Sequence, residues 1–357
     1  MSGKILLVGT CFKDKNSIIT QAELLYDELV CRNYNVSIVS KHRGYVKRLY
    51  ETTLAAIKLK KNDIILLQVY GSKSIYLEFL VSLIGSINGC KIISTLHGGL
   101  IPDFYSNNRL KRWLLDRLFK LSDTITVPNS YIKIQLEMQL KNAIVIKNLL
   151  PFKQNQETQT NIEKSFVIFW MRAFHEVYNP IKAVHILAHL HKSGLKAKMH
   201  MAGPDMGLLE ATLQEIKKHQ LEEFIVVHPK LSQTEINTLV SSCLVYLCTN
   251  DVDNAPVTFT EMMARGIPIV STCVGGIPHL VENRKHALLS RNNSVEDLAE
   301  LIIELYNTPE LRNRLIKNGK DYSQEFTPDK VVKNWEALLK LYDIRPIDGK
   351  INSNLSS

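Results

Sequence analysis

The sequence has few cysteines, and they are far apart. Six cysteines are distributed over 357 residues, and no Cys-x-x-Cys pair occurs. Zinc sites and redox-active pairs require closer spacing than this, so the sequence predicts no metal site. We instead expect reduced, mostly buried thiols, as in a protein of the cytoplasm.

Long hydrophobic runs are also missing. No window reaches about 18 consecutive apolar residues, the length that a membrane-spanning helix needs. The best candidate, Ile75–Ile87, is interrupted by Glu78, and the apolar run Lys4–Val8 is too short for a secretory signal. With 45% hydrophobic and 22% charged residues, the chain is long enough to form two domains with substantial cores. We therefore expect a soluble intracellular protein.

Two nucleotide-binding motifs are absent as well. The loop after the first predicted strand, Val8–Asp14, contains no Gly-x-Gly-x-x-Gly, and no Gly-x-x-x-x-Gly-Lys-Ser/Thr occurs. Chemistry based on nicotinamide dinucleotides or on a phosphate-binding loop of the ATPase type is therefore disfavoured.

Short apolar runs do alternate with helical patterns throughout the chain. This alternation predicts an α/β protein with parallel sheets, built from strand–helix–strand units. In the first half we expect strands at 4–8, 36–39, 64–69, 91–96, 124–128 and 143–147, with helices at 17–33, 46–61, 73–88, 107–121 and 130–140 between them. The second half repeats the pattern, with strands at 166–170, 198–202, 224–227, 244–248, 268–271 and 287–289.

A polar stretch separates the two halves and predicts the domain boundaries. We expect a first domain over 1–152, a linker over 153–164 and a second domain over 165–328. A final helix over 329–344 is expected to cross back to the first domain, followed by a flexible tail, 345–357. Two such doubly wound domains bind ligands at the carboxyl ends of their strands.

The excess of basic over acidic residues lies in the first half of the chain. The formal net charge is +9, yet residues 1–150 hold 21 of the 44 basic and only 11 of the 35 acidic residues. Two stretches, Lys41–Tyr50 and Arg109–Lys120, interleave bases with aromatic and aliphatic residues. They are typical of a basic surface that binds an anionic membrane or an acceptor, of a solvated helix face, or of a surface that binds nucleic acid. The cations concerned are Arg43, Lys47, Arg48, Arg109, Lys111, Arg112 and Arg117.

One segment, Asp251–Pro278, holds the clearest candidate site. An acid, Asp253, precedes a helix that carries a second acid, Glu261, and the next strand ends at Gly275-Gly276. The free N–H groups at the helix start suit a diphosphate, and the two carboxylates suit the hydroxyls of an elongated ligand. Alternatively, Asp253 caps the helix and Glu261 pairs with a base.

This segment resembles the donor-site signature of family 4 of the retaining glycosyltransferases, known as glycosyl transferases group 1, which have the GT-B fold. The family pattern is Glu-x7-Glu followed by Ala-x-Gly-x-Pro and Gly-Gly. By this resemblance Glu261 binds the nucleotide ribose, and Asp253, which replaces the first Glu, contacts the hydroxyls of the donor sugar. The resemblance also places the amides of Asn254, Ala255 and Val257 near the sugar and phosphates.

Further residues match the family outside this segment. Arg172 follows a strand, as does the family's arginine that neutralises the diphosphate. The family's lysine five residues later is replaced by Val177, so Lys182 becomes the candidate phosphate ligand. Gly203 resembles the Gly-Pro turn of the donor site, and His97 resembles the histidine at a strand end that faces the transferred sugar.

The resemblance implies a retaining, metal-independent hexosyltransferase. It would move a sugar from a UDP- or GDP-sugar to a glycan or lipid-linked acceptor in polysaccharide or lipopolysaccharide assembly, at the inner face of the cell membrane. No cofactor is implied, because the nucleotide-sugar is a substrate, and no nucleic acid partner is expected, because no nucleic-acid motif accompanies the bases. The alternatives are a non-catalytic scaffold that binds nucleotide-sugar, or a nucleotide-sugar epimerase on the same fold.

Overall fold

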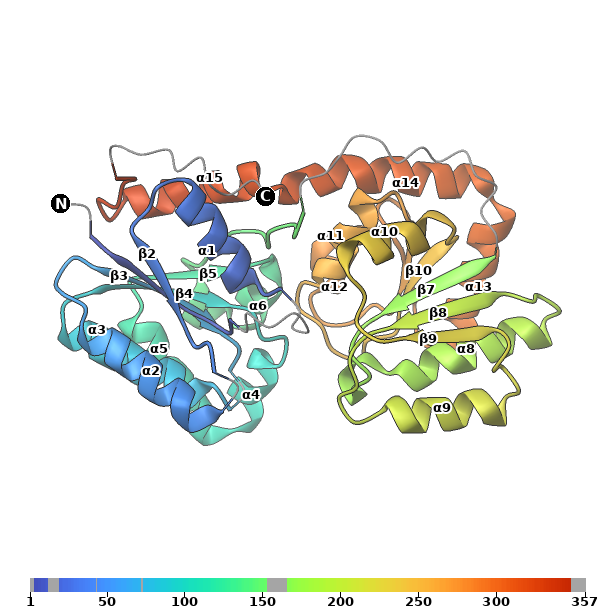
Figure 1. Cartoon of the computed structure of the whole chain (residues 1–357), viewed down its shortest axis with the longest axis horizontal. Coiled ribbons are helices and arrows are strands. Elements are labelled where there is room, and N and C mark those ends of the chain that lie inside the picture. The colour runs from blue at the N-terminus through green and yellow to red at the C-terminus, as the bar shows by residue number, and fades with distance from the viewer. Residues whose placement is uncertain (1–2, 12–18, 43, 72, 153–165, 348–357) are drawn as a thin grey trace. The chain divides into compact units, whose positions relative to one another are not determined.

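The structure, a computed structural model, describes residues 3–11, 19–42, 44–71, 73–152 and 166–347 (Figure 1). The chain divides into two compact units. Unit 1 consists of Met1–Pro151 together with Phe326–Ser357, and unit 2 consists of Phe152–Glu325. The predicted linker, 153–164, and Arg43 lie outside the described residues.

Unit 1 is built on a parallel sheet with strand order β2-β1-β3-β4-β5-β6. Its central strands β1, β3 and β4 are buried nearly throughout, as expected for strands covered by helices on both faces. The strands are β1 (Ile5–Val8), β2 (Val36–Val39), β3 (Ile64–Val69), β4 (Lys91–Leu96), β5 (Thr124–Val127) and β6 (Ile144–Val145).

Helices cover both faces of this sheet. On one face pack α2 (Tyr45–Ile57), α3 (Ile75–Ile87) and α5 (Arg109–Leu121), and on the other pack α1 (Gln21–Cys31) and α15 (Pro328–Lys340) (Figure 1). Short helices α4 (Ile101–Asn107), α6 (Ser130–Gln135) and α7 (Glu137–Leu140) complete the unit. Of the helices described, none is both long enough and apolar enough to cross a membrane.

The predicted helix at 107–121 is in fact preceded by a second helix, α4, that sequence analysis missed. Asn108 separates the two, because its backbone is extended and its side chain accepts a hydrogen bond from the Lys111 amide at 3.0 Å. An asparagine in this position begins a new helix instead of continuing the old one.

Unit 2 contains a second parallel sheet, with strand order β12-β11-β10-β7-β8-β9. Its strands are β7 (Val167–Met171), β8 (Lys198–Ala202), β9 (Ile225–His228), β10 (Val245–Cys248), β11 (Ile269–Ser271) and β12 (Leu288–Leu289). The prediction of an α/β protein with two parallel sheets is therefore confirmed. Strands β7 and β10 are neighbours at the centre of the sheet, and Trp170 and Tyr246 on them are fully buried.

The helices of unit 2 again cover both faces, with α8 and α9 on one and α10 and α11 on the other (Figure 1). They are α8 (Pro180–Lys192), α9 (Leu209–Lys218), α10 (Gln233–Ser241), α11 (Val257–Ala264), α12 (Ile277–Leu280), α13 (Val295–Asn307) and α14 (Pro309–Ser323). Ser232 and Glu235 form a capping box at the start of α10. Ser294 caps α13, but the Asp297 carboxylate accepts hydrogen bonds from the Ser290 hydroxyl and the Arg291 amide instead of completing a box.

The last helix, α15, belongs to the core of unit 1. Val331, Val332, Trp335 and Leu339 of α15 are buried in one cluster with strand residues such as Ile5. The chain therefore returns to the first sheet after completing the second.

Truncation of the Trp335 side chain of α15 should destabilise unit 1. We expect Trp335→Ala to lower the free energy of unfolding by about 3–5 kcal/mol, because it leaves a cavity where a 4% exposed indole packs. Denaturant unfolding measures the change. Leu341→Ala, at a side chain that is 75% exposed, is the matched control and should change stability little. Equal effects of the two substitutions would contradict this packing.

Candidate functional site

The candidate site of unit 2 begins where two central strands end. Strand β7 ends at Met171, directly before Arg172, and β10 ends at Cys248, five residues before Asp253. The strands are parallel neighbours, so their carboxyl ends lie at the same edge of the sheet. An Nη of Arg172 lies 3.1 Å from Oδ2 of Asp253, and the two side chains are only 13% and 15% exposed. The fold thus brings together two predicted site residues that are 81 positions apart.

Asp253 is held by several donors at once. The Asn250 amide nitrogen donates to its Oδ2 at 2.6 Å, and the backbone amides of Asn254 and Ala255 donate to the same carboxylate. Burial raises the pKa of Asp253, while the charge of Arg172 and these hydrogen bonds oppose the rise. Asp253 does not cap the following helix, because the N-cap of α11 is Pro256 and receives no side-chain bond.

Two buried polar atoms beside this pair lack a partner among the described residues. One is Nε of Arg172, a donor, and the other is Oδ1 of Asn250, an acceptor. Both belong to side chains that already hold the Asp253 carboxylate through their other atoms. Buried polar groups are normally satisfied, so an unpaired donor and an unpaired acceptor together indicate a place for a polar ligand.

Two glycines let the backbone close around the pair. Gly203 has a φ of +154°, and a Cβ there would lie 1.9 Å from the Arg172 carbonyl oxygen. Gly275 has a φ of +52°, and a Cβ there would lie 2.2 Å from the Asp253 carbonyl oxygen. Any side chain at either position would therefore push the loop away from the ion pair.

The second predicted acid, Glu261, is buried on α11 and faces an arginine. An Nη of Arg265 lies 3.5 Å from its carboxylate and donates to its carbonyl oxygen at 3.0 Å. Burial raises the pKa of Glu261, and the charges of Arg265 and Arg172 oppose the rise. Burial also lowers the pKa of Arg265 to about 10.

Arg265, which sequence analysis did not single out, fixes Glu261 in this position. Its guanidinium also donates to the side chains of Asn237, at 2.8 Å, and Gln233, both on α10, and stacks 4.0 Å from the Phe152 ring centroid. No local pattern distinguishes this arginine from one on a surface, because its partners lie about 30 residues earlier in the chain.

Lys182 forms an ion pair with Asp251, an acid to which the sequence analysis assigned no role. Its Nζ lies 2.8 Å from Oδ1 of Asp251, and the Asn179 side chain donates to the other oxygen, also at 2.8 Å. These contacts tie the start of α8 to the loop after β10. Lys182 is 18% exposed and Asp251 49% exposed, so a ligand could reach the pair from solvent.

The other predicted catalytic residue, His97, belongs to unit 1. It directly follows β4, and its Nε2 lies 2.5 Å from the side-chain oxygen of Gln68 on β3. Its ring stacks on Tyr70, with centroids 5.5 Å apart. Burial lowers the pKa of His97 to about 4, so the imidazole is neutral at pH 7.

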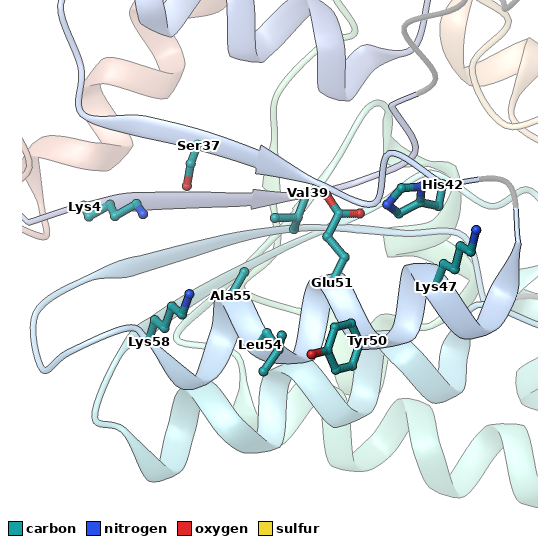
Figure 2. Close-up of a pocket in the computed structure, with 10 residues that line it drawn as sticks. All are labelled: Lys4, Ser37, Val39, His42, Lys47, Tyr50, Glu51, Leu54, Ala55 and Lys58. Atoms are coloured by element: carbon teal, nitrogen blue, oxygen red, sulfur yellow. The ribbon is translucent and has the colours of Figure 1, made fainter.

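Unit 1 also contains a pocket of about 560 Å³ between α2 and the edge strand β2 (Figure 2). It is lined by cationic and aromatic side chains, among them Lys4, Lys47, Tyr50 and Lys58 (Figure 2). The Glu51 carboxylate at the pocket is held by the backbone amides of Ser40 and Lys41. Lys47 and Arg48 were both predicted to lie on a membrane or acceptor surface. Of the two, only Lys47 lines this pocket.

Helices α2, α3 and α5 pack side by side and expose apolar and basic side chains (Figure 1). Among the apolar side chains of α5, Leu114 and Leu118 are buried, but Leu110 and Trp113 are 54% and 48% exposed. Three cations of this helix lie over aromatic rings: Lys111 over Phe104, Arg112 over Tyr105 and Arg117 over Trp113.

A comparison with family models matches residues 152–322 to "Glycosyl transferases group 1". This match covers nearly half of the chain and almost all of unit 2. The matched range contains Arg172, Asp253 and Glu261.

Relatives with curated descriptions agree with this match. An uncharacterized glycosyltransferase of Methanocaldococcus jannaschii is 31% identical over 67% of this chain and 65% of its own length. A putative colanic acid biosynthesis glycosyltransferase of Salmonella typhimurium is 28% identical over 35% of this chain and 33% of its own. The chain thus spans less than two thirds of either relative.

Solved structures agree in fold. HepE of Anabaena, in a crystal structure with UDP-glucose, aligns over 95% of this chain and 99% of its own, with a TM-score of 0.77 and 15% identity. At that identity the likeness concerns the fold alone, and it confirms the predicted GT-B class of two parallel-sheet domains.

The effects of substituting Arg172 and Asp253 on the free energy of unfolding should not be additive. We expect Arg172→Met to destabilise unit 2 by about 3–5 kcal/mol, because it leaves Asp253 buried without its counter-charge. The double variant with Asp253→Asn should lose much less than the sum of the single losses, as measured by denaturant unfolding. Lys285→Met, which removes an exposed ion pair with Glu282, should cost less than about 1 kcal/mol. Strict additivity of the two site substitutions would contradict the coupling.

Proposed function

We propose that this chain is a retaining, metal-independent glycosyltransferase that transfers a hexose from a UDP- or GDP-sugar. The observation that supports it most is the pair of unsatisfied buried atoms beside Asp253, the Arg172 Nε donor and the Asn250 Oδ1 acceptor. A nucleotide-sugar offers a matching partner for each, since its phosphates accept hydrogen bonds and its sugar hydroxyls donate them.

In this proposal Arg172 stabilises the departing nucleoside diphosphate. Negative charge grows on the leaving phosphate as the bond to the sugar breaks, and a guanidinium already held in place meets that charge without reorganising. Loss of one such contact typically costs ~10²–10³ in rate. The N–H groups in the first turn of α11, which begins at Val257, also stabilise the negative charge on the leaving phosphate. Lys182 supplies a second cation when a phosphate competes with Asp251 for it.

The acids orient the donor. Asp253 and Asn250 accept hydrogen bonds from the sugar hydroxyls, and Glu261, fixed by Arg265, accepts them from the ribose. By the family resemblance, the neutral imidazole of His97 is the candidate contact of the transferred sugar.

The relatives support a nucleotide-sugar donor and a polysaccharide setting. HepE of Anabaena is described with UDP-glucose, and the Salmonella relative is assigned to colanic acid biosynthesis. We infer a glycan or lipid-linked acceptor that meets the basic unit 1, and assembly of cell-surface polysaccharide or lipopolysaccharide at the inner face of the cell membrane.

The donor can be identified by thermal shift. In a screen of UDP, GDP, ADP and the monophosphate CMP, we expect one nucleoside diphosphate to stabilise the protein, by about 2.7 kcal/mol at 100 times its dissociation constant. Glu261→Ala should remove the shift, because the ribose loses its acceptor. Glu296→Ala, at an exposed acid in the first turn of α13, is the control and should keep it.

Transfer itself is tested with the donor so identified. Asp253→Ala should lower the rate by ~10²–10³, and EDTA should leave the rate unchanged. Full activity of Asp253→Ala would contradict the role of this acid, and turnover of the donor without an acceptor would favour an epimerase. Nucleotide binding without any transfer would favour a scaffold.

Membrane association is the second part of the proposal, and α5 supports it. Arg109, Arg112 and Trp113 of this helix are exposed, and each cation near an anionic bilayer contributes about 1 kcal/mol. We expect the chain to float with anionic vesicles at low salt. The triple variant Arg109→Ala, Arg112→Ala, Arg117→Ala should bind on the order of a hundredfold more weakly.

A matched triple variant in unit 2 controls for net charge. Lys192→Ala, Lys196→Ala and Lys198→Ala removes three exposed cations elsewhere and should float like the wild type. If both triple variants lose binding equally, the effect is one of total charge and α5 is not the contact.

A further inference from the structure

Unit 2 contains a cluster of two histidines and a glutamate that the donor site does not use. His185 lies in the middle of α8, Glu215 lies in the last turns of α9, and His219 directly follows α9. The two helices pack against each other on one face of the sheet (Figure 1). All three side chains reach solvent, with exposed fractions of 39%, 22% and 26%.

Both imidazoles point at the same carboxylate oxygen. Nε2 of His185 lies 3.0 Å and Nε2 of His219 lies 3.5 Å from Oε2 of Glu215. The two rings are turned 72° to each other, and one ligand atom of each residue lies within 4.8 Å of the others. Zinc bonds of 2.0–2.2 Å in a tetrahedron place neighbouring ligand atoms about 3.4 Å apart. The cluster therefore needs only small side-chain rotations to surround an ion.

We propose that His185, Glu215 and His219 bind a divalent transition metal ion, with zinc as the best match. Two imidazole nitrogens and one carboxylate oxygen form a ligand set that zinc accepts, and water would complete the coordination. Magnesium and calcium prefer oxygen ligands throughout, so the two imidazoles select against them.

Lys218 would compete with a metal ion for the Glu215 carboxylate. Its Nζ lies 2.9 Å and 3.2 Å from the two carboxylate oxygens of Glu215. A metal ion at Oε2 would repel this ammonium, which is 67% exposed and free to turn into solvent. Lys218 thus sets the affinity of the site without contributing a ligand.

The bound ion would clamp α8 to α9. His185 lies three residues after Lys182, and the start of α8 carries the contacts of Lys182 and Asn179 with Asp251. The ion's role is structural, since none of its ligands contacts Arg172, Asp253 or Glu261 through a hydrogen bond or ion pair that the described residues show. It is therefore consistent with transfer chemistry that needs no metal.

Zinc titration of the full chain, without an affinity tag and stripped of metal by a chelator, tests the site. Competition with a chromophoric chelator should give one zinc per chain, and His219→Ala and Glu215→Gln should each weaken binding at least about tenfold. His189→Ala, one turn after His185 on α8, is the matched control and should bind like the wild type. Lys218→Met should bind more tightly, because the competing ammonium is gone.

Two further measurements separate metal binding from a purely structural hydrogen-bond network. Cobalt should give visible d–d absorption in the wild type that is absent in His219→Ala, and zinc should raise the melting temperature of the wild type but not of that variant. Magnesium should do neither. Absence of zinc binding, or equal binding by the wild type and His219→Ala, would overturn the proposal.

Discussion

The parallel arrangement of β7 and β10 is the constraint on which the candidate site depends. Because these neighbours run in the same direction, the loops that follow them leave from one edge of the sheet, and Arg172 reaches Asp253 across it. The turns at Gly203 and Gly275 lie at the same edge. Gly203 packs closely on the carbonyl group of Arg172, and Gly275 packs closely on that of Asp253. A shift in the register of either strand would separate the charges and leave each of them buried alone, which is costly.

Burial of charge is what makes this edge suitable for chemistry. Desolvation raises the pKa values of Asp253 and Glu261, and a separate arginine opposes the effect at each acid, Arg172 at the first and Arg265 at the second. Each side chain is thereby fixed in one position before a ligand arrives. Such prior ordering is how a protein strengthens its electrostatic interactions with a substrate, since no reorganisation is required when charge develops.

In unit 1, by contrast with the buried charges of unit 2, the charged side chains are mostly exposed. The cations of α2 and α5 stay largely in solvent, beside exposed apolar side chains such as Tyr50 and Trp113. Charges in water are screened and contribute little to folding. The two units thus combine a rigid, buried charge pair with an open basic surface, each suited to a different kind of ligand.

The sequence alone determined the two parallel sheets, since the alternation of apolar runs with helical patterns leaves few other folds. Its resemblance to the donor-site signature of glycosyl transferases group 1 indicated Arg172, Asp253 and Glu261 as candidate site residues. Only the tertiary structure decided their partners. Asn250 and Arg265 carry no distinguishing local pattern, and α4 was missed because the capping role of Asn108 appears only when its side chain closes on the next helix. His185 lies 30 residues before Glu215, so no spacing motif relates them. Contacts of that kind arise from the packing of α8 on α9, and packing depends on the whole fold.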